Sequence, residues 1–187
     1  MKYDPDRPIK VKKALPEGIA DRLPDGIADE TSRREFFMRE ALKAASMSLD
    51  SGDIPVGCVI VRHNEIVSAG FNRREKERCA TLHAEIGAIE DACRALGGWR
   101  LVACEMFVTL EPCPMCAGAI ANARIPKLYI GAPDPKGGAC GGMCDLFSTN
   151  VNHKPEIYKD ILPEECSALL KEFFSEKRQR QVTEEDR

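Results

Sequence analysis

Four side chains in this sequence have the types and the spacing of a catalytic metal site. His83 and Glu85 stand two residues apart at the start of an apolar run. Cys113 and Cys116 stand three residues apart, with Pro114 between them. Zinc binds imidazole and thiolate ligands, and a catalytic zinc site has three protein ligands and leaves the fourth position to water. We therefore expect His83, Cys113 and Cys116 to bind one Zn²⁺ per chain.

The spacing within each pair limits how the side chains can share one point. Sulfurs three residues apart at a helix start face the same side, and the N–H groups there favour thiolate over thiol. Side chains two residues apart on a helix point about 200° apart, at roughly 100° per residue. His83 and Glu85 can therefore share a pocket only if His83 lies at the very start of its helix. Glu85 would then act as the proton carrier.

Each motif alone also occurs in proteins of other kinds. Most glutamates are solvated, a C-x-x-C pair is found in redox dithiols too, and a fourth protein ligand would make the site structural. A redox dithiol leaves His83 and Glu85 without a role. Taken together, the motifs match the H-x-E…P-C-x-x-C signature of zinc-dependent nucleobase deaminases. Ligand identity does not distinguish zinc from iron.

Composition indicates one globular domain. The chain has 187 residues, of which 43% are hydrophobic and 30% charged, and its net charge is −3. No apolar run approaches the roughly 20 residues of a membrane span. The first residues, MKYDPDRPIKVKK, lack the apolar segment of a signal peptide. We therefore expect a cytoplasmic protein without a membrane partner and without an overall basic charge.

The nine cysteines are odd in number, which favours thiols over disulfides in a reducing compartment. Cys58 and Cys93 lie in apolar stretches, and we expect both to fill the core. Cys140 and Cys144 stand four apart in a glycine-rich loop, where two inert thiols or a second metal site are the alternatives.

The elements that position these groups follow from periodicity and punctuation. A helix is expected from Ser32, which has capping-box spacing to Glu35, to just before Gly52. Its apolar face would contain Met38, Leu42, Ala45 and Leu49.

Downstream of that helix, strands alternate with helices, which predicts an α/β layered domain with helices covering a central sheet. The expected elements are two strands within 55–72 around a turn at 62–65, a helix at 83–96, a strand at 106–110, a helix at 114–123, a strand at 127–132 and a helix at 164–180.

Residues 1–30 differ from the rest of the chain. LPEGIAD at 15–21 is nearly repeated as LPDGIAD at 23–29, and no helical or strand periodicity forms. We expect a flexible or loosely docked N-terminal extension over 1–30, followed by the deaminase domain over 31–187.

The chain from about 33 to 180 resembles the bacterial tRNA-specific adenosine deaminase family, within the cytidine deaminase-like superfamily. The matching stretches are IPVGCVIV, GFNRRE, TLHAEIGAI, MFVTLEPCPMCAGAIANARI, GAPDPKGGACGG and ILPEECSALLKEFFSEKR. The resemblance implies a three-layer α/β/α fold with a central five-stranded mixed sheet, and a homodimer. The implied activity is hydrolytic, zinc-dependent deamination of the wobble adenosine of a tRNA anticodon loop to inosine.

The resemblance also implies roles for individual residues. His83, Cys113 and Cys116 match the zinc ligands, and Glu85 matches the proton shuttle. The substrate-binding residues that it implies are Asn72, the backbone at Ala84, and Asp134 and Lys136 in a loop that contacts the nucleic-acid backbone.

The substrate-binding residues also fit plainer roles. Asn72 has the residue type of an ordinary turn, and PDPKGG, which contains Asp134 and Lys136, reads as a plain turn. Phe173 and Phe174, followed by Lys177 and Arg178, resemble an RNA-facing helix, or are a core phenylalanine and a basic helix end.

Two other functions stay open at this point. The same zinc chemistry could act on a small substrate, namely guanine, cytosine or a cytidine nucleotide. The domain could also be a metal-stabilised scaffold that binds RNA without reaction.

Overall fold

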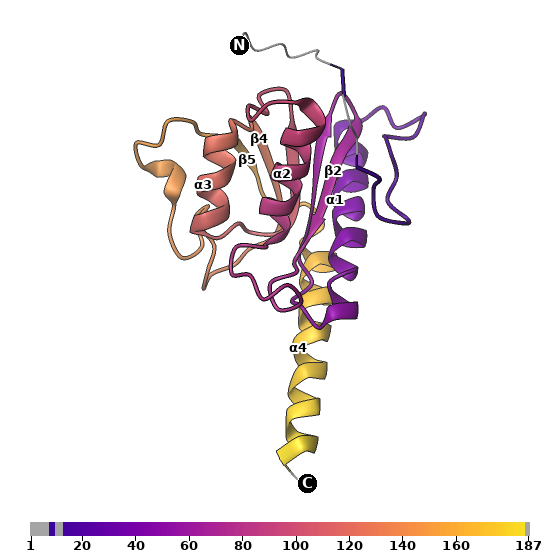
Figure 1. Ribbon diagram of the computed structural model, residues 1–187, viewed down its shortest axis with the longest axis vertical. Helices are drawn as coiled ribbons and strands as arrows, with labels where there is room; N and C mark the ends of the chain where they lie inside the picture. The colour runs from indigo at the N-terminus through magenta and orange to yellow at the C-terminus, as the bar shows by residue number, and fades with distance from the viewer. Residues whose placement is uncertain (1–7, 10–12, 186–187) are drawn as a thin grey trace.

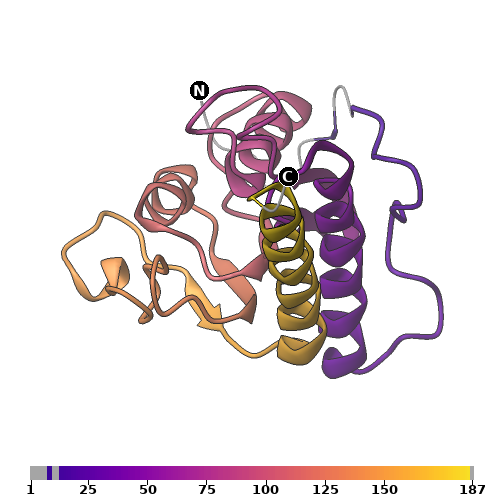
Figure 2. The same ribbon diagram turned by 90° about the horizontal axis from the view of Figure 1, so that it is seen from below.

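A five-stranded sheet lies between two pairs of helices in the computed structural model (Figures 1 and 2). The structure describes residues 8–9 and 13–185, with side chains as far as residue 180. In chain order the elements are α1 (Glu30–Ser46), η1 (Leu49–Ser51), β1 (Gly57–Arg62), β2 (Glu65–Phe71), α2 (Ala84–Leu96), β3 (Glu105–Leu110), α3 (Pro114–Ala123), β4 (Lys127–Ala132), η2 (Leu146–Ser148), β5 (Glu156–Tyr158) and α4 (Pro163–Glu185).

The strand order is β2-β1-β3-β4-β5. β1 pairs antiparallel with β2 and with β3, whereas β3–β4 and β4–β5 are parallel. The turn between β1 and β2 consists of His63 and Asn64, whose φ angles of 51° and 62° are both positive. Two successive positive φ angles match the right-handed twist of a tight hairpin, so the predicted hairpin is confirmed.

Each face of the sheet carries its own core. α2 and α3 cover one face with small side chains, among them Ala88, Ala92 and Ala117. α1 and α4 cover the other face, where the rings of Phe107 and Tyr129 stack with centroids 4.3 Å apart. The expected three-layer α/β/α fold with a five-stranded mixed sheet is confirmed.

The start of α1 differs from the prediction. The helix begins at Glu30, and the cap is the Asp29 carboxylate, which accepts a hydrogen bond from the Ser32 N–H at 2.8 Å. Aspartate caps a helix as well as serine does, and here Asp29 takes the cap position three residues before Ser32. The predicted helix also ends early, at Ser46, and Leu49 lies 42% exposed in η1 instead of on the buried face.

Two further elements differ from their predictions. α4 runs to Glu185, five residues beyond the predicted end, and has no base in its last turn. β5 was not predicted from periodicity, because three residues are too few to show a strand pattern.

Residues 13–29 run along the outer edge of β2. Leu15, Ile19 and Leu23 pack against the core beneath α1. The Leu23 N–H donates to the Asn64 carbonyl at 2.8 Å, and the Ile66 N–H donates to the Asp21 carbonyl at 2.8 Å.

On the opposite face of the sheet, the Lys13 ammonium pairs with Asp91 of α2 at 3.0 Å. The extension therefore contacts both helix layers across the sheet edge. None of the helices in the described part of the chain has the length and apolar composition to cross a membrane.

Candidate metal centre and substrate cavity

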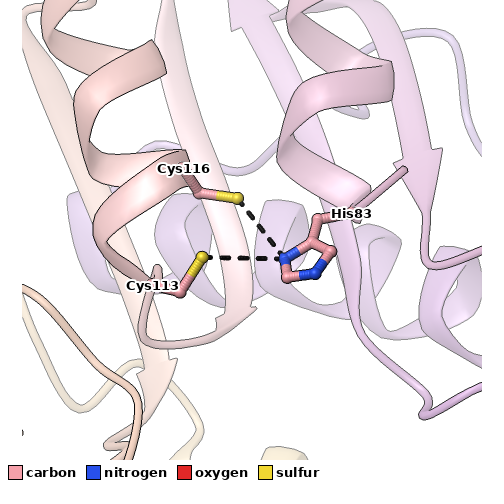
Figure 3. Close-up of side chains that lie close together, drawn as sticks. All are labelled: His83, Cys113 and Cys116. Carbon is pink, nitrogen blue, oxygen red and sulfur yellow. Dashed lines mark hydrogen bonds between the residues drawn. The ribbon is translucent and has the colours of Figure 1, made fainter. Parts of the chain in front are cut away.

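The side chains of His83, Cys113 and Cys116 point toward one another (Figure 3). His83 Nδ1 lies 3.7 Å from Cys113 Sγ and 3.6 Å from Cys116 Sγ, and the three ligand atoms all lie within 4.8 Å of one another. Around a tetrahedral zinc with bonds of about 2.0 Å to nitrogen and 2.3 Å to sulfur, these atoms would be about 3.6 Å apart. The residues therefore fit a zinc ion in both donor type and spacing.

Two helix N-termini meet at this group. His83 is the N-cap of α2, and Cys113 is the N-cap of α3, with Cys116 in its first turn. The positive ends of both helix dipoles therefore face the sulfurs. A hydrogen bond from Cys116 lowers the pKa of Cys113 to about 4, and the same bond raises the pKa of Cys116. The protein alone thus favours a thiolate at Cys113, which is the form that binds a metal.

Glu85 lies in the first turn of α2, beside the group formed by His83, Cys113 and Cys116, and is 3% exposed. Burial raises the pKa of its carboxyl group above the ordinary value. His83 occupies the N-cap, which is the position that the sequence required if His83 and Glu85 were to share a pocket. The two side chains do line the same cavity. A buried acid beside a metal site can take up and release a proton without contact with bulk water.

A cavity of about 170 Å³ opens at the carboxyl end of β3. Four of the predicted residues besides the ligands line it, namely Asn72, Ala84, Glu85 and Asp134. Lys136 is exposed and does not line it. The full lining is Ile54, Val56, Asn72, Arg74, His83, Ala84, Glu85, Leu110, Glu111, Cys113 and Asp134.

Asn72 is 8% exposed and its amide is held from two sides. Its Nδ2 donates to the Ile54 carbonyl at 3.1 Å, and its Oδ1 accepts from the Arg74 N–H at 3.3 Å. Asp134 Oδ1 accepts from the N–H groups of Lys136 and Gly137, both at 3.0 Å, which makes this segment the turn that its composition suggested.

Glu111 was not predicted as a functional residue, although it precedes the C-x-x-C motif. It is 4% exposed, and its carboxylate accepts from the N–H groups of Asp134, Cys140 and Gly142 at 3.0, 2.8 and 2.9 Å. Glu111 therefore folds the 133–142 loop against the cavity. The only signal in the sequence is an acid directly after a buried strand.

Arg74 was also missed as a lining residue; in sequence it is one of several charges in a polar loop. Cys140 is buried and Cys144 is exposed. Among the described residues, His83, Cys113 and Cys116 form the one group of three or more side chains arranged to hold a metal, so no second metal site involves Cys140 and Cys144 there.

Sequence comparison identifies the family to which these features belong. Residues 31–132 match the family described as the cytidine and deoxycytidylate deaminase zinc-binding region. The tRNA-specific adenosine deaminase of Bacillus subtilis (strain 168) is 44% identical over 147 residues, which cover 78% of this chain and 91% of that protein. The enzyme of the same name from Agrobacterium fabrum is 41% identical over 79% of this chain and 97% of its own length.

Solved structures agree with the sequence matches. A chain from a study of A-to-I editing by tRNA:A34 deaminases at the wobble position of transfer RNA is 41% identical, has a TM-score of 0.70, and is matched over 72% of this chain and 98% of its own length. The guanine deaminase of Bacillus subtilis is 35% identical with a TM-score of 0.52, over 65% of this chain and 77% of its own.

Proposed function

The chain belongs to the cytidine and deoxycytidylate deaminase zinc-binding family, and from this membership we propose that it deaminates the wobble adenosine of a tRNA anticodon to inosine. The observation that carries the proposal is a buried acid, Glu85, beside a His/Cys/Cys group at the wall of a cavity of the size of a base. The choice of adenosine in tRNA rests on the relatives that are 41–44% identical over most of their length.

His83, Cys113 and Cys116 would hold the zinc ion. When bound, zinc supplies Lewis-acid activation of a water molecule near neutral pH. Glu85 would carry both protons of the attacking water: the first goes to the ring nitrogen as the C6–O bond forms, and the second, from the added hydroxyl, goes to the amine as the C6–N bond breaks, so that ammonia leaves and inosine remains.

The cavity walls fit a base that has left its stack. Ile54, Val56 and Leu110 provide apolar surface, while the Asn72 amide and the backbone at Ala84 provide polar groups to orient the base. A cavity of about 170 Å³ encloses a base but not a helical segment of RNA. The target nucleotide must therefore be turned outward, which requires less energy in a single-stranded loop than in a duplex.

The distal half of α4 extends beyond the rest of the molecule and offers additional surface to a substrate larger than a free base. Figure 1 shows that the distal half of α4 projects from the end of the molecule at which α2 and α3 begin. A groove of about 580 Å³ lies between α4 and η1, with Phe173, Lys177 and Arg180 in its lining. Asp50, Glu172 and Glu176 line it too, so the charge on this part of α4 is mixed rather than basic.

The test is a deamination assay with zinc-loaded protein. An anticodon stem-loop with a wobble adenosine is compared with guanine, cytosine, cytidine and dCMP. We expect inosine in the stem-loop only, with a rate that falls as salt rises. The Glu85→Gln variant should react about 10²–10⁴-fold more slowly, with its zinc content and its fold unchanged.

Three outcomes would each reject a part of this proposal. Ammonia from a small substrate alone would assign the chain to nucleobase or nucleotide deamination by the same chemistry. Full activity of Glu85→Gln would remove Glu85 from the mechanism, and RNA binding without any turnover would make the domain a metal-stabilised scaffold.

We further propose that Lys136 contacts the RNA backbone beside the cavity, that the protein is a homodimer, and that it acts in the cytoplasm. Exposure of Lys136 in the turn next to Asp134 supports the first statement. The tRNA-acting relatives support the third. Equilibrium sedimentation over a range of protein concentrations tests the second.

A further inference from the structure

Asp53 is a buried carboxylate that no step of the proposed reaction uses. Its side chain is fully buried. One oxygen accepts from the Glu75 N–H at 2.6 Å, and the other accepts from the Ser51 hydroxyl at 2.7 Å and from the Lys76 N–H at 3.2 Å. Asp53 does not line the cavity, so it acts through other residues.

These hydrogen bonds join two segments that form one wall of the cavity. Residues 51–56 contribute Ile54 and Val56 to the wall, and residues 72–76 contribute Asn72 and Arg74. The Asn72 N–H donates to the Val56 carbonyl at 3.0 Å, and its side-chain amide donates to the Ile54 carbonyl. At the other end of the 72–76 segment, the Glu75 and Lys76 N–H groups bond to Asp53 and so link this segment to residues 51–56 a second time.

The Asp53 side chain is held in its charged form, so its role goes beyond filling space in the core. Burial raises the pKa of the Asp53 carboxyl, but the three hydrogen bonds outweigh burial, and the net effect lowers the pKa below its ordinary value. The folded chain therefore holds Asp53 as a carboxylate. Charge-assisted hydrogen bonds are shorter and stronger than neutral ones, so this group fixes the 74–76 backbone more firmly than a neutral side chain would.

We propose that Asp53 is a positioning residue that holds the 72–76 segment against residues 51–56, so that the Asn72 amide faces the substrate base. The inference rests on the proposed deamination for its kinetic readout, whereas the connection itself can be observed without substrate. It adds a residue outside the cavity to the determinants of substrate binding.

The experiment combines Asp53→Asn with Asn72→Ala in a double-mutant cycle on the anticodon stem-loop. Asparagine retains the shape of aspartate but places an NH₂ group against a donor, so one or two bonds to the 75–76 backbone are lost. We expect kcat/KM to fall about tenfold or more, mainly through a raised KM, with zinc content unchanged. In the Asn72→Ala background the same change should have little further effect, because the two residues act as one unit.

Glu77→Gln is the matched control, because it removes an exposed acid from the same loop and should leave KM unchanged. Ser51→Ala removes the hydroxyl that bonds Asp53, and that also lies 3.0 Å from the Ser48 carbonyl, but it leaves both bonds from Asp53 to the 75–76 backbone. It should give a smaller effect in the same direction, which covers the case in which Asp53→Asn folds poorly. Fully additive effects in the cycle, or an unchanged KM in Asp53→Asn, would overturn the proposal.

Amide hydrogen exchange separates this inference from the proposed function. If the wild-type protein deaminates no stem-loop, the proposed function fails. Exchange at Glu75 and Lys76 then decides the role of Asp53, because we expect it to be faster in Asp53→Asn and unchanged in Glu77→Gln. Unaltered exchange in Asp53→Asn would overturn the inference.

Discussion

The position of His83 at the N-cap determines what its neighbours can do. An N-cap residue has extended rather than helical backbone angles, and His83 has φ −76° and ψ 159°. This change of direction places the imidazole beside Cys113 and Cys116 while Glu85, in the first helical turn, lines the same cavity. One turn further into the helix, residues two apart would point to opposite sides.

The Cys113→Ala variant tests whether His83, Cys113 and Cys116 bind zinc. The variant should lose most of its zinc, because two ligands cannot complete the set, and its melting temperature should fall. A site filled at a hundredfold excess over its Kd contributes about 2.7 kcal/mol to stability. Elemental analysis and calorimetry measure both effects. Cys144→Ala is the control, because Cys144 is exposed, and equal zinc content in the two variants would contradict the assignment.

The sequence predicted that His83, Cys113 and Cys116 lie together, as the structure shows, because H-x-E and P-C-x-x-C in combination match a single signature. It did not predict Asp53 or Glu111 as site residues. Both carboxylates accept hydrogen bonds from backbone N–H groups of distant loops, over separations such as 22 and 29 residues. A backbone N–H carries no residue type, so no pattern of letters indicates such a bond before the fold is known.

At the scale of elements, α2 can approach the sheet only because β2 has a glycine where they meet. A Cβ atom on Gly70 would lie 2.1 Å from the Ala84 carbonyl oxygen and 2.8 Å from the Ala88 nitrogen. Backbone atoms cannot rotate away as side-chain ends do. Gly70 therefore sets the position of the helix start that carries His83 and Glu85.

Gly70→Ala should accordingly destabilise the fold and reduce activity together. We expect a loss of about 3 kcal/mol, the upper end for overpacking, and a melting temperature lower by roughly 6–12 °C. Thermal denaturation and the deamination assay measure these effects. Gly87→Ala in α2 is the control, since its added methyl group meets only the end of Arg73 at 3.6 Å. It should be neutral or slightly stabilising.

Element types could be predicted better than element ends. α3 and β4 match their predicted ranges because Pro114 opens α3, and because Leu128, Tyr129 and Ile130 give β4 a continuous apolar centre. The start of α1 was wrong because Asp29 and Ser32 are both good caps within one stretch, and the sequence does not distinguish them. β5 depends on pairing with β4 and has too little sequence to show it alone.

Over the whole molecule, the extension joins the two helix layers around the β2 edge. Edge strands present unpaired backbone groups to other chains, and a covering segment is one way in which proteins protect them. The repeat explains how the extension turns. In each copy the glycine, Gly18 or Gly26, has a positive φ of 83° or 95°, as the third residue of a tight turn requires.

Deletion of residues 1–27 tests how much this cover contributes. Removal of half-buried Leu15, Ile19 and Leu23 should lower the free energy of unfolding by about 1–3 kcal/mol, after the entropy of ordering the segment is subtracted. Denaturant titration measures the loss, and we expect deamination of the stem-loop to persist. Lys13→Ala should change stability little, because that ion pair is exposed. Lost activity with an unchanged unfolding free energy would instead give the extension a role at the site.

The path of the N-terminal extension around the β2 edge has a consequence for synthesis on the ribosome. Lys13 leaves the ribosome first, yet its partner Asp91 follows 78 residues later. At about 5–20 residues per second, Lys13 therefore precedes its partner by roughly 4–16 s, and the leucine and isoleucine side chains of the extension likewise precede Phe107 and Tyr129 of the core that they cover. In the LPEGIAD and LPDGIAD segments, acids, proline and glycine interrupt the apolar residues every one or two positions. Such interruptions disfavour strand pairing between chains. The composition that forms the two turns therefore also protects residues 15–29 from aggregation during synthesis.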